Sequence, residues 1–132
     1  AQLRVEDIDL RAGLMRVRRP KVSKVQTLRM SADTRKAMER WLELEARDEG
    51  ALLYSYQGKP LTTRTATGRV RFLGERIGVQ SLSAHDCRHY WTTKAVRDGI
   101  PLTTIKEAGG WSSLNMLDHY TRPSRIANEG MV

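Results

Sequence analysis

The chain has 132 residues, 39% of them hydrophobic, and its 23 Lys and Arg against 15 Asp and Glu give a net charge of +8 and a pI near 10.1. This length suits one domain with a packed core, and no run approaches the roughly 20 apolar residues needed to span a bilayer. The first residues show no secretory signal, and the single cysteine, Cys87, excludes an internal disulfide. We therefore expect a basic, cytoplasmic protein without a membrane partner.

The positive charge is concentrated near the N-terminus. Residues 11–30 contain seven Lys and Arg and no acid, whereas residues 33–49 contain six acids and four bases. A basic stripe on one segment is typical of nucleic-acid binding, and an ordinary soluble basic surface is the alternative.

The first predicted elements are a hairpin and a helix. Residues 14–19 ("LMRVRR") and 25–30 ("VQTLRM") are apolar and β-branched on either side of "PKVSK", which predicts two antiparallel strands. Ser31 is a suitable N-cap for a helix over residues 32–49, and Gly50 is expected to end it.

The rest of the chain is predicted to be mainly helical. After a short extended piece and a loop, we expect a helix over 63–77, a second from Ser83 to Asp98 that Gly99 ends, and short helices in 101–110 and 112–120. The fold class is therefore α+β, mainly α-helical, with a small N-terminal hairpin or antiparallel sheet packed on a helical catalytic domain.

The segment "LSAHDCRHYWTT" contains the first candidate chemistry. His85 and Arg88 are three positions apart, so their side chains share a helix face and could together hold a phosphate. A metal site of His85, Cys87 and His89 is set aside, because i, i+2 and i+4 do not share a helix face and no second ligand cluster exists. H-x-x-R alone is a weak signal.

Three motifs that follow one another along the chain are together a much more specific signal of function. "LSAHDCRHYWTT", then "IKEAGGWSSLNMLDHYTR", preceded by a basic hairpin with a lysine at its tip, resemble the C-terminal catalytic half of the tyrosine recombinases, the phage integrase family. The resemblance spans nearly the whole chain. It implies the catalytic residues Tyr120 (the nucleophile, nine residues after Trp111), Arg88, His85, Lys21 and Trp111.

One family feature has no match in the chain. The family carries a further catalytic arginine just before the segment that "LRVEDIDL" resembles, and the hairpin register places Arg4 after that position. We therefore expect a partial catalytic domain over residues 1–132, with a hairpin at 14–30 and a helical part at 31–132. The first catalytic arginine and the N-terminal core-binding domain are expected to be absent.

The resemblance also implies a mechanism and partners. Tyr120 would cleave double-stranded DNA through a 3′-phosphotyrosyl bond, without metal or other cofactor, in a bacterial, archaeal or phage-encoded recombinase that acts as a tetramer on DNA. Such enzymes serve DNA integration and mobile elements. The expected phosphate contacts are Arg16, Arg18, Arg19, Lys24, Arg64, Arg69 and Arg71.

Three alternatives remain open at this point. A type IB topoisomerase would share the same chemistry, and a non-catalytic DNA-binding remnant would lack the upstream arginine. Lys24 is the rival of Lys21 as general acid. His89 is expected to be a structural hydrogen-bonding residue and not a catalyst.

Overall fold

A small antiparallel sheet lies in the first part of the chain in the computed structural model, which describes residues 3–19 and 23–120. Its strands are β1 (Ile8–Asp9), β2 (Leu14–Arg19) and β3 (Lys24–Arg29), in the order β1-β2-β3. The register of β2 and β3 pairs Leu14 with Arg29 and Arg19 with Lys24. The predicted hairpin is confirmed, and β1, which the sequence did not indicate, adds a third strand.

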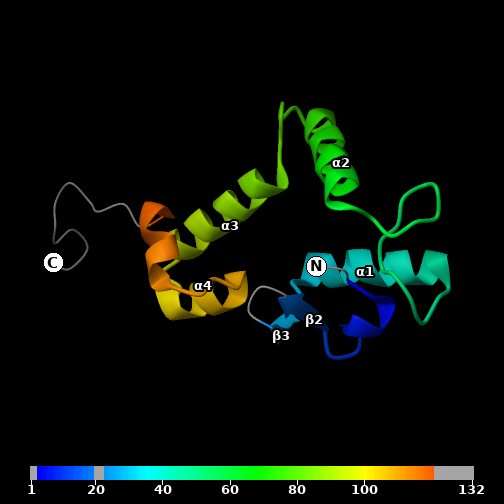
Figure 1. Ribbon diagram of the computed structural model, residues 1–132, viewed down its shortest axis with the longest axis horizontal. Helices are drawn as coiled ribbons and strands as arrows, with labels where there is room; N and C mark the ends of the chain where they lie inside the picture. Colours follow the sequence, from blue (N-terminus) through cyan, green and yellow to red (C-terminus); the bar gives the residue numbers. More distant parts are fainter. Residues whose placement is uncertain (1–2, 20–22, 121–132) are drawn as a thin grey trace, which may run out of the picture. The chain divides into compact units, whose positions relative to one another are not determined.

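Helix α1 (Ala32–Glu45) follows the sheet (Figure 1). The Ser31 side chain accepts a hydrogen bond from the Thr34 N–H at 3.2 Å, so the predicted N-cap is confirmed. The predicted end at Gly50 is wrong, because Ala46 already adopts a left-handed conformation with φ 48°. The chain leaves the helix there so that Ala51 can pair with Arg4 and the Leu52 N–H can bind the Leu3 carbonyl.

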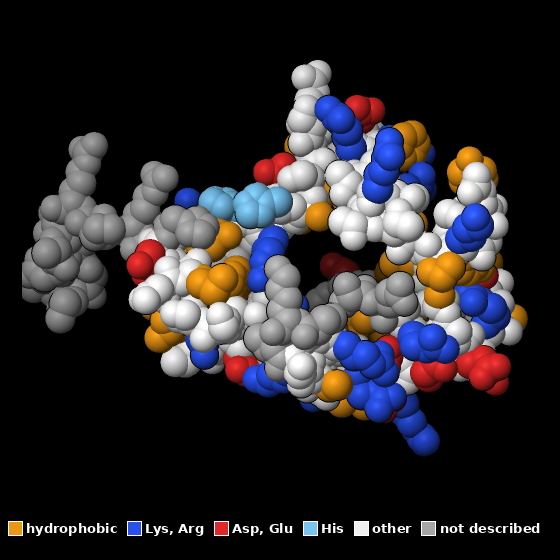
Figure 2. All heavy atoms as spheres, in the orientation of Figure 1, with side chains coloured by type: hydrophobic (Ala, Val, Ile, Leu, Met, Phe, Trp, Pro, Cys, Tyr) orange, Lys and Arg blue, Asp and Glu red, His pale blue; other side chains and the backbone are white. Residues whose placement is uncertain are grey.

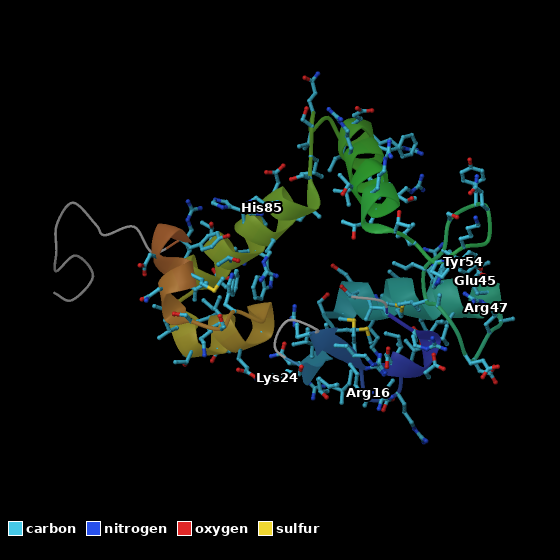
Figure 3. The ribbon with its side chains drawn as sticks, in the orientation of Figure 1. Arg16, Lys24, Glu45, Arg47, Tyr54 and His85 are labelled. Atoms are coloured by element: carbon cyan, nitrogen blue, oxygen red, sulfur yellow. The ribbon has the colours of Figure 1, made fainter. Side chains whose placement is uncertain are left out.

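These elements belong to the first of two compact units, Ala1–Ala66 and Thr67–Val132. The core of the first unit contains Leu52, which is buried, and the half-buried Trp41, whose indole N–H donates to the Leu52 carbonyl at 2.8 Å. Beside them, the Arg47 guanidinium stacks over the Tyr54 ring, 4.5 Å from its centroid, and Figure 3 shows Arg47, Tyr54 and Glu45 near one another.

Helix α2 (Thr63–Arg76) crosses the boundary and leads into the second unit. Near its end Gly74 is buried, and a Cβ there would lie 2.5 Å from the Cβ of Leu82. The missing side chain therefore lets the loop after α2 fold back against the helix.

The second unit is helical, as predicted (Figure 1). It continues with α3 (Ala84–Arg97), α4 (Leu102–Gly109) and the 3₁₀ helix η3 (Leu114–Tyr120). Its core consists of Ile105, Leu117 and Tyr120, against which Val96 and Trp111 pack. The α+β, mainly helical fold class is confirmed. Among the described residues, no helix is both long and apolar enough to cross a membrane.

Candidate active site and nucleic-acid interface

The first turn of α3 is fixed by a reciprocal capping box. The Asp86 N–H donates to the Ser83 hydroxyl oxygen, and the Ser83 N–H donates to the Asp86 carboxylate, each at 3.0 Å. The hydrogen bonds from Ser83 lower the pKa of Asp86, and the nearby His85 and His89 lower it further. The first turn of α3, which carries His85, is thereby held in place, and its acidic residue Asp86 suits the positive end of the helix dipole.

One face of α3 carries the predicted chemistry. His85, Arg88, His89 and Thr92 recur at helical spacing, and Thr92 is fully buried with its hydroxyl bonded to the Arg88 carbonyl at 2.8 Å. His85 is exposed on α3, one turn before Arg88, and Figure 3 labels it there. This face therefore runs from solvent at His85 into the core at Thr92.

Arg88 is held by two contacts, one from the last residue of α4 and one from the turn that follows it. One guanidinium nitrogen donates to the Gly109 carbonyl at 2.5 Å, and the guanidinium carbon lies 4.2 Å from the centroid of the Trp111 ring. A guanidinium that stacks and hydrogen-bonds at once has little rotational freedom. Arg88 remains exposed, so its fixed guanidinium can meet an anion from solvent.

The two glycines before Trp111 make this arrangement possible. Gly110 ends α4 in the left-handed region at φ 73°. The Trp111 ring lies so close to Gly109 that a Cβ on Gly109 would be 2.0 Å from a ring carbon. Gly109 therefore supplies both a carbonyl for Arg88 and a surface on which the indole can lie.

Tyr120 lies at the end of η3 and is only 9% exposed. Its ring centroid is 6.1 Å from that of Trp111 and 5.0 Å from that of His89, at interplanar angles of 56° and 49°. Trp91 stacks on Trp111 from α3, with centroids 6.5 Å apart. These tilted or offset pairs are the arrangements that aromatic rings prefer.

The structure thus brings together three of the predicted catalytic residues. Trp111 contacts both Arg88 and Tyr120. His85 is on the same helix as Arg88 but is not among the residues that these contacts join. Lys21 lies outside the described residues. Its rival Lys24 begins β3, opposite Arg19, and is labelled on the sheet in Figure 3.

Sequence reasoning missed the nearest ring neighbour of Tyr120. His89 is expected from the sequence to be a structural hydrogen-bonding residue, which stays a prediction, and the structure adds that its ring packs on the Tyr120 ring. The i, i+4 spacing from His85 was the available signal, because it places both imidazoles on one face of α3. The role of Gly109 was also missed, although two glycines directly before a tryptophan are a signal that the ring lies close to the backbone.

Three arginines of β2, which were predicted to contact DNA, have partners inside the first unit. Arg18 pairs with the buried carboxylate of Asp7 at 2.5 Å, and Arg16 donates to the Glu6 carbonyl at 3.0 Å. Arg19 donates to the Gln26 side chain at 2.8 Å. Arg16 and Arg18 keep about half of their side chains exposed, so these pairs orient them without hiding them.

The predicted DNA-contacting arginines of α2 lie on its exposed surface. Arg64 and Arg71 are seven residues apart, as are Arg69 and Arg76, so each pair lies along one line of the helix. The Arg69 and Arg76 guanidinium carbons lie 5.0 Å and 6.0 Å from the centroid of the exposed Phe72 ring. Figure 2 shows Lys and Arg side chains gathered over α2.

No group of three or more His, Cys, Asp or Glu in the described part of the chain could hold a metal ion. His85, Cys87 and His89 of the described α3 therefore form no such group.

The fold and this cluster define a class, the catalytic domain of tyrosine recombinases. The chain aligns with the solved structure of XerA recombinase at a TM-score of 0.82 and 26% identity, covering 98% of this chain and 49% of that one. It also aligns in fold with XerH recombinase bound to difH, at a TM-score of 0.77 and 23% identity, covering 94% of this chain and 38% of that one.

Comparison of the sequence with known protein families identifies the family of this chain. Residues 1–125 match the phage integrase family, and the chain belongs to it. It is 33% identical over 122 residues to the tyrosine recombinase XerC of Pseudomonas fluorescens, covering 90% of this chain and 41% of the relative. The XerC of Pseudomonas aeruginosa is 34% identical over 122 residues, with 90% and 40% covered. The chain thus spans about two fifths of these relatives.

Proposed function

We propose that the chain supplies the nucleophile and phosphate-binding residues of a site-specific DNA recombinase, which cleaves and rejoins DNA through a 3′-phosphotyrosyl intermediate. One observation carries the proposal: Trp111 contacts both the tyrosine at the end of η3 and the fixed guanidinium of Arg88. The phenol of Tyr120 and the oriented guanidinium of Arg88 contact the same indole ring. This arrangement suits phosphoryl transfer, because positioning and charge stabilisation supply most of the catalysis of that reaction.

The proposed reaction conserves the phosphodiester. The Tyr120 phenol oxygen attacks the scissile phosphorus, the bond from phosphorus to the 5′ oxygen breaks, and a phosphotyrosyl bond forms. Lys21 donates a proton to the leaving 5′ oxygen, and His85 contacts the phosphate and assists loss of the phenol proton. Attack of a new 5′ hydroxyl on the phosphotyrosyl bond reverses these steps, so rejoining needs no ATP.

Arg88 and Trp111 act on charge and position in this scheme. Arg88 neutralises the non-bridging oxygens of the phosphate, and the indole N–H of Trp111 donates to the same group. The basic residues of β2, β3 and α2 (Arg16, Arg18, Arg19, Lys24, Arg64, Arg69 and Arg71) contact the backbone of double-stranded DNA. The working assembly is a homotetramer on DNA in the cytoplasm.

A nicked suicide substrate tests the proposal, because the cleaved piece diffuses away and traps the covalent adduct. The chain is assayed alone and joined to the part of P. aeruginosa XerC that precedes the matched region. We expect an adduct that migrates as a protein–DNA species and is abolished by Tyr120→Phe. Tyr90→Phe, which alters an exposed tyrosine of α3, is the matched control and keeps the adduct. Absence of an adduct in both forms contradicts the proposal.

Two further assays separate recombination from simple relaxation. A recombinase exchanges strands between two sites on one plasmid, whereas a type IB topoisomerase relaxes supercoils without a second site. We expect products of two-site exchange that depend on Tyr120. Relaxation of plasmids that lack a recombination site, without exchange, would favour the topoisomerase.

A further inference from the structure

The ring of the proposed nucleophile has an aromatic neighbour from each of two elements. His89 reaches it from α3 with ring centroids 5.0 Å apart, and Trp111 reaches it from the turn after α4 at 6.1 Å. Tyr120 is 9% exposed, so these rings belong to the packing that shields it. Both neighbours are tilted by about 50°, at 49° and 56°, which favours edge-to-face contact.

Tyr120 needs such support because its own element is weak. Residues Leu114–Tyr120 form a 3₁₀ helix, whose hydrogen-bond geometry is poorer than that of an α-helix. The phenol oxygen must nevertheless stand in line with the bond that breaks, and misplacement by about 1 Å can reduce a rate about 100-fold. Contacts from outside η3 must therefore fix the ring.

His89 is well placed to provide this support. It follows Arg88 on α3, a 14-residue helix whose first turn is fixed by the Ser83–Asp86 capping box. Its backbone is therefore better ordered by local hydrogen bonds than that of η3. Trp111, in contrast, is already engaged by the Arg88 guanidinium, so the ring of His89 is the aromatic contact on Tyr120 that is separate from the proposed phosphate-binding pair. The aliphatic side chains of Ile105 and Leu117 share the buried cluster with Tyr120.

We propose that His89 is a positioning residue for Tyr120: its ring packs on the phenol ring and holds the nucleophile in line for attack. This inference rests on the proposed function. It gives the two histidines of α3 different tasks, since His85 contacts the phosphate and His89 acts only through Tyr120. In this proposal the packing of the ring, and not an imidazole proton, holds Tyr120.

Two variants separate ring packing from proton chemistry. His89→Ala removes the ring, and we expect the rate of adduct formation on the suicide substrate to fall about 10- to 100-fold. His89→Phe restores a ring of similar shape without ring nitrogens, and we expect a rate within about threefold of the unaltered protein. A wild-type rate in His89→Ala, or a His89→Phe variant as slow as His89→Ala, overturns the proposal.

A second readout needs no DNA and no activity. Tetranitromethane nitrates accessible tyrosines, and mass spectrometry locates the products. The measurement uses a Cys87→Ser background, because the reagent oxidises thiols and Cys87 is exposed. We expect Tyr120 to be protected in the unaltered chain and in His89→Phe, and to react in His89→Ala at a rate approaching that of Tyr90. Continued protection of Tyr120 in His89→Ala overturns the ring contact.

The controls separate this inference from the proposed function. Tyr56 and Tyr90 are 97% and 68% exposed and should be nitrated in every variant. His85→Ala should reduce cleavage while leaving Tyr120 protected, and an unchanged circular dichroism spectrum excludes unfolding of His89→Ala. If the unaltered protein forms no adduct, the proposed function fails, and the nitration result still decides whether His89 holds Tyr120.

Discussion

At the scale of single residues, the contacts of Arg88 support its proposed role in binding an anion. A free arginine side chain loses rotamer entropy when it binds phosphate, whereas Arg88 is already bonded to the Gly109 carbonyl and stacked on Trp111. The cost of orienting the guanidinium is therefore met during folding, which is the condition for strong stabilisation of developing charge.

Replacing this guanidinium by an ammonium should expose the effect. Arg88→Lys keeps the positive charge but loses the planar fork and much of the stacking on Trp111. We expect the rate of adduct formation to fall about 100-fold or more, as when an oriented donor to a transition state is removed. Binding of duplex DNA, measured by fluorescence anisotropy, should change by less than about threefold. A variant that cleaves at close to the wild-type rate would contradict the assigned role.

Gly109 gives a second test at a single position. A Cβ there would lie 2.0 Å from the Trp111 ring, so Gly109→Ala must displace the indole. We expect the free energy of unfolding to fall by about 1–3 kcal/mol, the usual cost of overpacking, and the adduct rate to fall with it. Urea denaturation followed by tryptophan fluorescence measures the first effect.

Gly68→Ala is the matched control for this substitution. Gly68 lies inside α2, and a Cβ there meets nothing within 4 Å. Alanine should stabilise that helix by up to about 1 kcal/mol, because it is the better helix former. If Gly109→Ala unfolds at the same urea concentration as the unaltered chain, or at a higher one as Gly68→Ala should, Trp111 does not need the space above Gly109.

At the scale of elements, the sequence predicted most of the secondary structure because its signals were local. Ser31 and Ser83 cap the helices that they were expected to cap, and α2, α3 and α4 lie where apolar spacing and glycines placed them. Propensity, capping and turn chemistry act within a few residues, so a single sequence reveals them.

The missed features depend on residues far apart in the chain. Strand β1 has only two residues and exists because β2 pairs with it, and α1 ends at Glu45 because Ala51 returns to pair with Arg4. In the candidate site, the family resemblance of the ordered motifs implied Arg88, Trp111 and Tyr120, whereas the packing of His89 on Tyr120 required tertiary structure.

A pH-sensitive ion pair joins Arg18 of β2 to Asp7, which lies in the 3₁₀ turn Val5–Asp7 just before the sheet. The hydrogen bond from Arg18 is the main cause that lowers the pKa of Asp7 below its ordinary value of 3.8. Because the folded pKa is the lower one, the pair stabilises the fold fully above about pH 5, and this contribution is lost as the pH falls through 3.8 and below. Asp7→Asn should therefore destabilise the hairpin by about 1.5 kcal/mol at neutral pH, and less at pH 3.

Hydrogen exchange of the β2 and β3 amides measures this difference. Asp48→Asn, which removes an exposed carboxylate from the loop after α1, is the charge-matched control and should leave the protection of the hairpin unchanged. A loss of protection in Asp7→Asn that is as large at pH 3 as at pH 7 would show that the carboxylate charge is not what Arg18 requires.

At the scale of the whole molecule, the net charge of +8 is unevenly spread. Acidic residues accompany the bases of α1, whereas α2 contains four arginines and one acid, Glu75. In Figure 2, Lys and Arg side chains stand out over α2 and, in the first unit, around the sheet. Concentrated charge of this kind is what the proposed local contact with phosphates requires, while spread charge would give only general attraction to DNA.

The salt dependence of binding distinguishes these two kinds of attraction. Each phosphate contact that a protein loses should reduce the slope of log K against log salt by about 0.9. The double variant Arg69→Gln/Arg71→Gln should therefore reduce the slope by about 1.8 on a random-sequence duplex, measured by anisotropy over a series of NaCl concentrations. Affinity should fall by a similar factor on any sequence, because phosphate contacts carry no sequence information.

A second double variant, which removes the same amount of charge from α1, separates phosphate contacts from the effect of net charge. Lys36→Gln/Arg40→Gln removes two exposed positive charges from α1, where acidic neighbours surround them, and lowers the net charge by the same amount. Its slope should stay within error of the unaltered chain. If both double variants reduce the slope equally, the attraction comes from net charge alone and α2 makes no dedicated phosphate contacts. If only the α2 variant does, the arginines of this helix lie against the DNA backbone.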